Sequence, residues 1–137
     1  MEEPYLFATM LALAGPPETK PTGSVRVGPG EQIVAIGDSI TESGGYLRAI
    51  EAVFAQQYPE LKVPAIINAG ISGQKAEDLV ERFRPDVVDR RPAIVTVSVG
   101  VNDVWHRLEM PHDETVLETY ADNVERMVRM ARDANIR

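Results

Sequence analysis

Residues 93–103 read AIVTVSVGVND, and this stretch decides the fold class. Its first seven residues are a short run rich in β-branched side chains, ended by Gly100, which is typical of a buried strand. Residues 33–36, IVAI, form a similar run that also ends at a glycine. Residues 63–67, VPAII, form another, in which Pro64 indicates that the strand begins just after the proline. Short continuous apolar strands of this kind favour a parallel sheet that is covered on both faces.

The segments between and after these strands have apolar residues at helical spacing. We predict a helix over residues 43–58, another over residues 74–83, and a further turn opened by Pro85. After the last strand, Asp113 or Thr115 can cap a long helix. The apolar stripe of that helix consists of Leu117, Tyr120, Val124, Met127, Val128 and Ala131.

Strand and helix therefore alternate three times, which predicts an α/β fold with a parallel sheet between helix layers. Residues 135–137 read NIR, like the entry to a further strand. Three strands leave an exposed sheet edge, which proteins usually avoid. We therefore expect the chain to be a fragment, truncated after the third strand–helix unit. The alternative is a genuine three-stranded domain stabilised by dimerisation.

The domain is expected over residues 31–137, preceded by an N-terminal segment and linker over residues 1–30. Residues 15–30 hold four of the ten prolines and four glycines, which is typical of a linker. Residues 5–14 form an apolar run ending in small residues, which resembles a signal cleavage site, but glutamates precede it where positive charge belongs. The compartment, cytoplasmic or exported, therefore stays open. The run is too short to span a bilayer, so no transmembrane segment is expected.

Composition excludes several classes of function. The chain has 137 residues, 44% of them hydrophobic and 26% charged, as expected of one globular domain. Its net charge of −7 makes nucleic acid a poor partner, because phosphate backbones repel acidic chains. Without cysteine there is no disulfide, thiolate nucleophile or cysteine-ligated metal. Only two histidines, His106 and His112, are present, although hydrolytic serines usually need a histidine base.

Small and polar residues follow each predicted strand: residues 37–41, GDSIT, residues 68–73, NAGISG, and residues 100–103, GVND. Because the carboxyl ends of parallel strands share one edge of the sheet, where ligands bind, we expect these loops to converge on one site. Each loop alone has a plain structural explanation. An Asp-Ser pair can cap a helix, and an Asn-Asp pair can form a turn.

The loops also carry residues suited to ester chemistry. Ser39 is predicted near a helix N-terminus, whose free backbone N–H groups suit a serine that attacks an ester. Gly70 and Gly73 allow a backbone N–H to point into the site without a Cβ in the way. Asn102 has two side-chain N–H groups that can donate to an oxyanion. Loss of one such donor typically lowers kcat by about 10²–10³-fold.

Together, and in this order, the three loops resemble the signature blocks of the SGNH (GDSL-type) serine hydrolases, over about residues 31–106. The resemblance implies a flavodoxin-like three-layer α/β/α sandwich. It also implies a serine ester hydrolase that acts through an acyl-serine intermediate, on a small-molecule ester such as an acetylated sugar or a short acyl ester. It implies no metal or organic cofactor.

By the same resemblance, Ser39 corresponds to the nucleophile of the family. The backbone N–H groups of Ser39 and Gly73, together with the Asn102 side chain, correspond to the oxyanion hole. Asp38 and Asp103 are expected to shape their loops.

One part of the family's pattern is missing, an Asp-x-x-His pair near the C-terminal end whose histidine takes the serine proton. Residues 103–106, DVWH, spell the same pattern, but one loop then supplies both the oxyanion donor and the base, on opposite sides of the attacked carbon. We therefore assign Trp105 and His106 to the substrate cleft, or His106 to the surface, with His106 as base the minor alternative. His112 is expected to be solvated, and the chain alone to be inactive or nearly so.

Two other readings remain open. The loops can hold an anion or a nucleotide without chemistry, although the glycine-rich dinucleotide and P-loop motifs are absent. In the second reading, the chain is a degenerate, non-catalytic family member that acts through contacts with a partner. The substrate and the oligomeric state cannot be read from the sequence.

Overall fold

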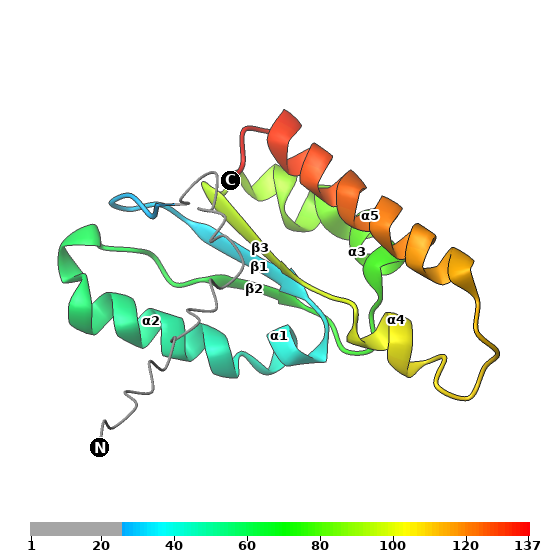
Figure 1. The fold of residues 1–137 in the computed structure, drawn as a ribbon. Helices are drawn as coiled ribbons and strands as arrows, with labels where there is room; N and C mark the ends of the chain where they lie inside the picture. Colours follow the sequence, from blue (N-terminus) through cyan, green and yellow to red (C-terminus); the bar gives the residue numbers. More distant parts are fainter. Residues whose placement is uncertain (1–25) are drawn as a thin grey trace, which may run out of the picture.

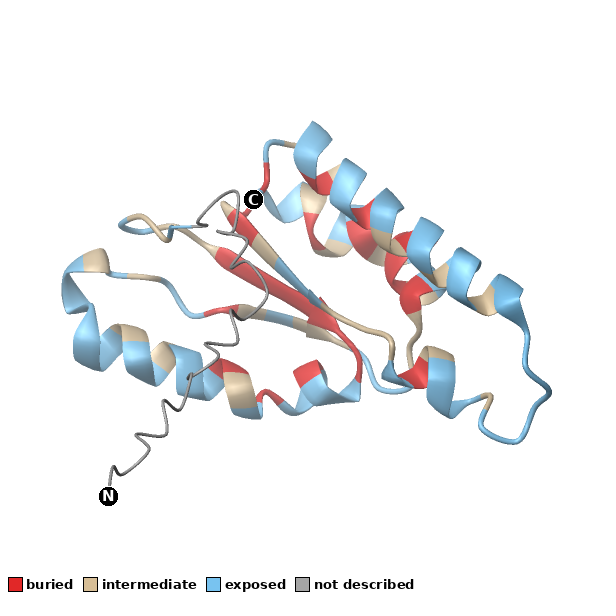
Figure 2. Ribbon diagram, viewed as in Figure 1, coloured by how far each residue is buried: buried red, intermediate tan, exposed pale blue. Residues whose placement is uncertain are grey.

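β1, Ile33–Gly37, is the central strand of a three-stranded sheet in the computed structural model, which describes residues 26–137. β2, Ile67–Gly70, and β3, Ile94–Ser98, pair with β1 in parallel on its two sides. Every residue of β1 is buried, as Figure 2 shows along the middle of the sheet. The parallel sheet predicted from the three apolar runs is therefore confirmed.

Helices cover both faces of the sheet (Figure 1). α2, Gly45–Gln57, lies on one face, and α3, Ala76–Asp86, and α5, Glu114–Asp133, lie on the other. Alternate side chains of β1 point to opposite faces. Those on the α2 side join a small core with Leu47, and those on the other side join a larger core with α3 and α5. This is the predicted three-layer α/β/α sandwich.

Four shorter helices complete the fold. α1, Ser39–Ser43, follows β1, and α4, Val101–Trp105, follows β3. Two single 3₁₀ turns, η1, Pro59–Leu61, and η2, Val88–Arg90, lie in the connections. Because α1 and α4 begin at the carboxyl ends of their strands, both stand on the edge of the sheet where the loops meet (Figure 1).

β2 begins later than the prediction over residues 63–67. Pro64 has no N–H to donate, and side chains from elsewhere satisfy the next backbone groups. The Ile66 N–H donates to Glu51 Oε1 (2.7 Å), and the Ala65 carbonyl accepts from Gln32 Nε2 (2.8 Å). Side chains thus take the place of a neighbouring strand as hydrogen-bond partners of residues 65 and 66, and regular strand pairing begins only at Ile67.

Two helix predictions also need correction. The helix predicted over residues 43–58 is interrupted at Gly44, whose left-handed φ of 69° separates α1 from α2. α3 continues through Pro85, which was predicted to open a separate turn. Val87 N–H still reaches the Phe83 carbonyl at 3.0 Å, so the proline costs only one bond near the helix end.

Of the two caps proposed for α5, Asp113 is the one used, and its side chain accepts from the Thr115 N–H. Two residues of the predicted α5 stripe, Leu117 and Val128, are exposed.

The backbone of Arg137 continues the sheet beyond β3. Its N–H donates to the Ala93 carbonyl (3.0 Å), and its carbonyl accepts from the Val95 N–H (2.8 Å), the pattern of a parallel pair. The Arg137 guanidinium bonds Glu31, which lowers the pKa of that carboxyl, helped by the Gly28 N–H. Between residues 26 and 137 no helix is long and apolar enough to cross a bilayer. The predicted signal-like run, residues 5–14, and most of the predicted linker lie outside the described residues.

Candidate active site

Ser39 is the first residue of α1, and one residue separates it from the end of β1 at Gly37. That intervening residue, Asp38, is 1% exposed, and its carboxylate caps the helix by accepting from the Ile40 N–H at 2.9 Å. Ser39 itself is exposed. The cap therefore holds the serine at a tight strand-to-helix turn while its side chain faces solvent.

The loop after β2 packs directly against this turn. The Ile71 N–H donates to the Gly37 carbonyl at 3.0 Å, and Asn68 Nδ2 donates to the Thr41 carbonyl at 2.8 Å. Gly70 lies so close to α1 that a Cβ added there would come within 2.1 Å of the Glu42 nitrogen. Only glycine permits this approach, so Gly70 has a packing role.

Replacing Gly70 by alanine is expected to push α1 away from β2 and to lower the free energy of unfolding by about 1–3 kcal/mol, because the clash is with backbone that cannot rotate aside. Chemical denaturation measures the loss. Gly45→Ala is the matched control, since no atom lies within 4 Å of its added Cβ and its φ is not left-handed. Equal stability of the two variants would contradict the packing role of Gly70.

Gly73 differs from Gly70 in both respects. Its φ is +78°, a conformation that favours glycine, and the space around an added Cβ is empty. The residue is exposed, on the loop between β2 and α3.

The loop after β3 is tied to the loop after β2 by two side chains. Asn102, 8% exposed, donates from Nδ2 to the Gln74 carbonyl at 2.9 Å. Both carboxylate oxygens of Asp103 lie 3.3 Å from the Ala76 nitrogen at the start of α3. The two loops are therefore held as one unit, with Gln74 directly after Gly73.

Among residues 26–137, no acceptor is found for the backbone N–H groups of Ser39 and Gly73, and only one of the two hydrogens on Asn102 Nδ2 has an acceptor. An Asn amide with one hydrogen held by a carbonyl keeps its second hydrogen in a defined direction. Donors fixed in advance are what a developing oxyanion requires.

Neither histidine contacts Ser39. His106, the C-cap residue after α4, is exposed and has no hydrogen bond to Asp103, whose carboxylate faces Ala76 instead. His112 is 84% exposed and lies 3.2 Å from a Glu114 oxygen. Trp105, at the end of α4, is 67% exposed.

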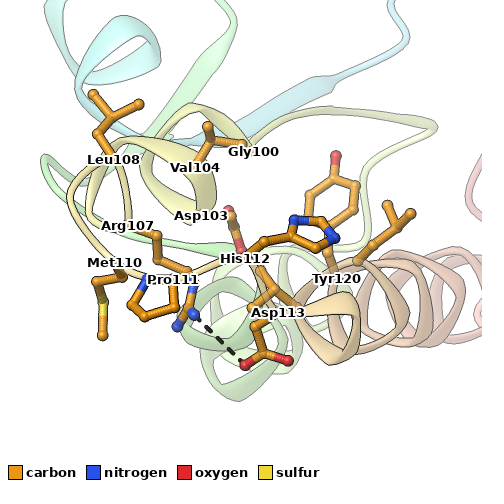
Figure 3. A pocket seen from close by; sticks show the side chains of 12 residues that line it. Gly100, Asp103, Val104, Arg107, Leu108, Met110, Pro111, His112, Asp113 and Tyr120 are labelled. Carbon is orange, nitrogen blue, oxygen red and sulfur yellow. Dashed lines mark ion pairs between the residues drawn. The ribbon is translucent and has the colours of Figure 1, made fainter.

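A cavity of about 650 Å³ lies between α4, the loop that follows it and the start of α5 (Figure 3). Its lining is mainly apolar and includes Gly100, Asp103 and the Arg107–Asp113 ion pair (3.5 Å), but not Ser39, Gly73 or Asn102. The pKa of the Asp113 carboxyl is lowered, first by the Thr115 hydroxyl, then by the Thr115 N–H, with Arg107 adding to the effect. The volume is within the range of small-molecule sites.

The sequence pattern does not predict the roles of two residues of this edge. The pattern indicates Gln74 only as the start of a helix, yet its carbonyl bridges the second and third loops. Arg82 sits in the helical register of the apolar α3 residues and is nearly buried. The one signal for Arg82 was its position three residues after Leu79 and directly before Phe83, where an apolar side chain is expected. No group of three His, Asp or Glu side chains suited to a metal occurs in the described part of the chain.

The chain is similar to known proteins in sequence and in fold. Residues 35–137 match the GDSL-like lipase/acylhydrolase family. The chain is 33% identical over 102 residues to an acetylxylan esterase of Geobacillus stearothermophilus, covering 64% of this chain and 46% of that one. It is 37% identical over 78 residues to an uncharacterised lipoprotein of Bacillus subtilis, covering 53% of this chain and 32% of that one.

The fold agrees with solved structures as well. A crystal structure of the Geobacillus stearothermophilus acetylxylan esterase has a TM-score of 0.71 and 29% identity, covering 80% of this chain and 58% of that one. Catalytic mutants of that esterase replace a serine, an aspartate or a histidine by alanine. The chain thus spans about half the length of the relatives it matches.

Proposed function

Because the chain belongs to the GDSL-like lipase/acylhydrolase family, we propose that it carries the nucleophile and the oxyanion hole of a serine esterase that removes acetyl groups from sugars. The observation that carries this proposal is the site edge itself. An exposed serine begins a helix whose N-cap is the buried Asp38, and it lies on the same edge as the Asn102 amide, one hydrogen of which is already bonded to the Gln74 carbonyl.

The proposed reaction has two steps. Ser39 Oγ attacks the acetyl carbonyl carbon and its proton passes to a general base, while the carbonyl oxygen becomes an oxyanion bound by the N–H groups of Ser39 and Gly73 and by Asn102. The C–O bond to the sugar breaks, and the sugar oxygen takes the proton from the base. Water then hydrolyses the acetyl-serine by the same route, releasing acetate and the free serine.

Neither histidine of this chain is assigned as the base of the proposed reaction. His106 caps the end of α4 and has no hydrogen bond to Ser39, and His112 is solvated beside Glu114. Without a base the serine stays protonated. The oxyanion hole and substrate binding alone then accelerate the reaction by only about 10³–10⁴-fold over the rate in water. We therefore propose that the chain by itself is inactive or nearly so, and that the protein encoded by the natural gene is the enzyme to test.

The acetylated sugar is supported by the relatives and by the surroundings of Asn102. The Geobacillus protein is an acetylxylan esterase, also described as an acetyl-xylooligosaccharide esterase. On α4, Trp105 follows Asn102 closely and is available to stack on a sugar ring, and the mainly apolar cavity that Gly100 helps to line has room for one.

Fluorophosphonate labelling tests the proposal. We expect the naturally encoded protein to gain one probe mass, located on Ser39 by peptide mapping, and to release acetate from acetylated xylo-oligosaccharides. Ser43→Ala is the matched control, because Ser43 lies on the same short helix and its hydroxyl is engaged with the Ile40 carbonyl. Its labelling should equal that of the wild type, whereas Ser39→Ala should not label. A folded wild-type protein that neither labels nor releases acetate would instead favour a non-catalytic binding protein.

A further inference from the structure

We propose that Arg82 is a positioning residue of this active site, because one guanidinium holds all three loops of the site in register. The inference rests on the proposed esterase function. Arg82 touches neither Ser39 nor Asn102 directly; its effect is argued through the groups that carry them.

The Arg82 side chain, on α3, is 13% exposed and reaches the carboxyl ends of two strands. Nη2 donates to the Gly37 carbonyl (3.0 Å), at the end of β1, and Nη1 donates to the Ala69 carbonyl (2.9 Å), in β2. Gly37 lies two residues before the nucleophile, and Ala69 lies directly before the glycine that packs on α1. The guanidinium therefore ties the first loop to the second.

The same side chain also reaches the third loop. Arg82 Nε donates to the Gln74 side-chain oxygen (2.5 Å), and the Gln74 backbone carbonyl accepts from Asn102 Nδ2 (2.9 Å). Gln74 therefore connects Arg82 to the side-chain amide of Asn102, and it directly follows Gly73 in the sequence. Arg82 is therefore connected to each proposed oxyanion donor. It reaches Ser39 through the Gly37 carbonyl, and it reaches Gly73 and Asn102 through Gln74.

The geometry requires arginine. A guanidinium has five N–H groups in one plane, and here three nitrogens serve four acceptors, the fourth being Asp86 at 2.7 Å on the next turn. A lysine has a single nitrogen and cannot reach acceptors on both strands and the loop at once. The Asp86 carboxylate balances the charge, so the cation is retained in a nearly buried position.

A positioning role predicts a loss in kcat with little change in KM, because a displacement of about 1 Å at reacting groups costs about 100-fold in rate. We expect Arg82→Gln to lower kcat for acetate release by about 10- to 100-fold, with KM within about threefold of wild type. Arg82→Lys should lose nearly as much, although it keeps the charge. Arg84→Gln is the matched control, because Arg84 is on the same helix but exposed, and it should keep wild-type kcat.

A double-mutant cycle separates positioning from plain stabilisation. If Arg82 acts partly through Asn102, Arg82→Gln should cost clearly less in an Asn102→Ala background than in wild type, because the orientation of that amide is already lost and only the effect exerted through the Gly37 carbonyl remains. A purely structural role would make the two losses multiply. Gln74→Ala, which removes only the acceptor of Arg82 Nε, provides the same cycle should Arg82→Gln fail to fold.

The outcomes distinguish the two proposals. A wild-type protein without Ser39-dependent acetate release overturns the esterase function, and this inference with it. An active wild type in which Arg82→Gln or Gln74→Ala keeps full kcat, or loses it multiplicatively with Asn102→Ala, overturns the role of Arg82 alone. Loss of kcat at constant KM, smaller in the Asn102→Ala background than in wild type, supports it.

Discussion

Replacing Ser39 by alanine is expected to lower kcat for acetate release by about 10⁵–10⁶-fold in the naturally encoded protein, because the only proposed nucleophile is removed. The fold should be unaffected. Asp38, not Ser39, caps α1, and the Ser39 side chain makes no hydrogen bond within residues 26–137. Acetate release by the purified variant, measured beside its thermal midpoint, tests both parts.

The control for this result is again Ser43→Ala, which removes a hydroxyl four residues further along the same edge. It should keep wild-type kcat. A loss of less than tenfold in Ser39→Ala would remove Ser39 from the role of nucleophile, whereas a large loss accompanied by unfolding would point to the turn itself.

Asn102→Ala is expected to lower kcat by about 10²–10³-fold, or roughly 3–4 kcal/mol of transition-state stabilisation. The alanine has no donor for the oxyanion, and it also releases the Gln74 carbonyl. Asn102→Asp should be at least as damaging, because an ionised carboxylate only accepts hydrogen bonds and would face both the Gln74 carbonyl and a negative oxygen.

Asn123→Ala is the matched control for the Asn102 variants. Asn123 is a buried asparagine on α5, bonded through its side-chain oxygen to Arg126, and it lies outside the three loops. We expect a comparable loss of stability with an unchanged kcat. Equal losses of kcat in Asn102→Ala and Asn123→Ala would show that the effect is one of folding, not of oxyanion binding.

The sheet could be predicted from sequence because its strands are short, continuous and apolar, each ending at glycine and polar residues. The prediction was wrong where side chains replaced backbone partners. Ile66 has the composition of a strand residue, yet its N–H is satisfied by Glu51, from a helix 15 residues earlier. Such a long-range side-chain bond leaves no local signal.

The candidate site was only partly visible in the sequence for a related reason. Ser39 and Asn102 could be named because each lies in a short motif at a strand end. Arg82 and Gln74 could not, because Arg82 donates to a carbonyl 45 residues away and the Gln74 carbonyl accepts from an amide 28 residues away. Backbone carbonyls are present at every residue, so the sequence does not identify which of them accept.

The central place of β1 has a consequence for the order in which the protein folds. β2 is about 30 residues from its partner in β1, but β3 is about 60 residues away. Closing the longer loop costs about 0.6 kcal/mol more entropy for the doubled length. We therefore expect β1 to pair with β2 first, which would place the Ser39 turn against Gly70. Asn102 is brought to the edge with β3, so we expect the turn that carries the proposed nucleophile to form before the proposed oxyanion donor reaches it.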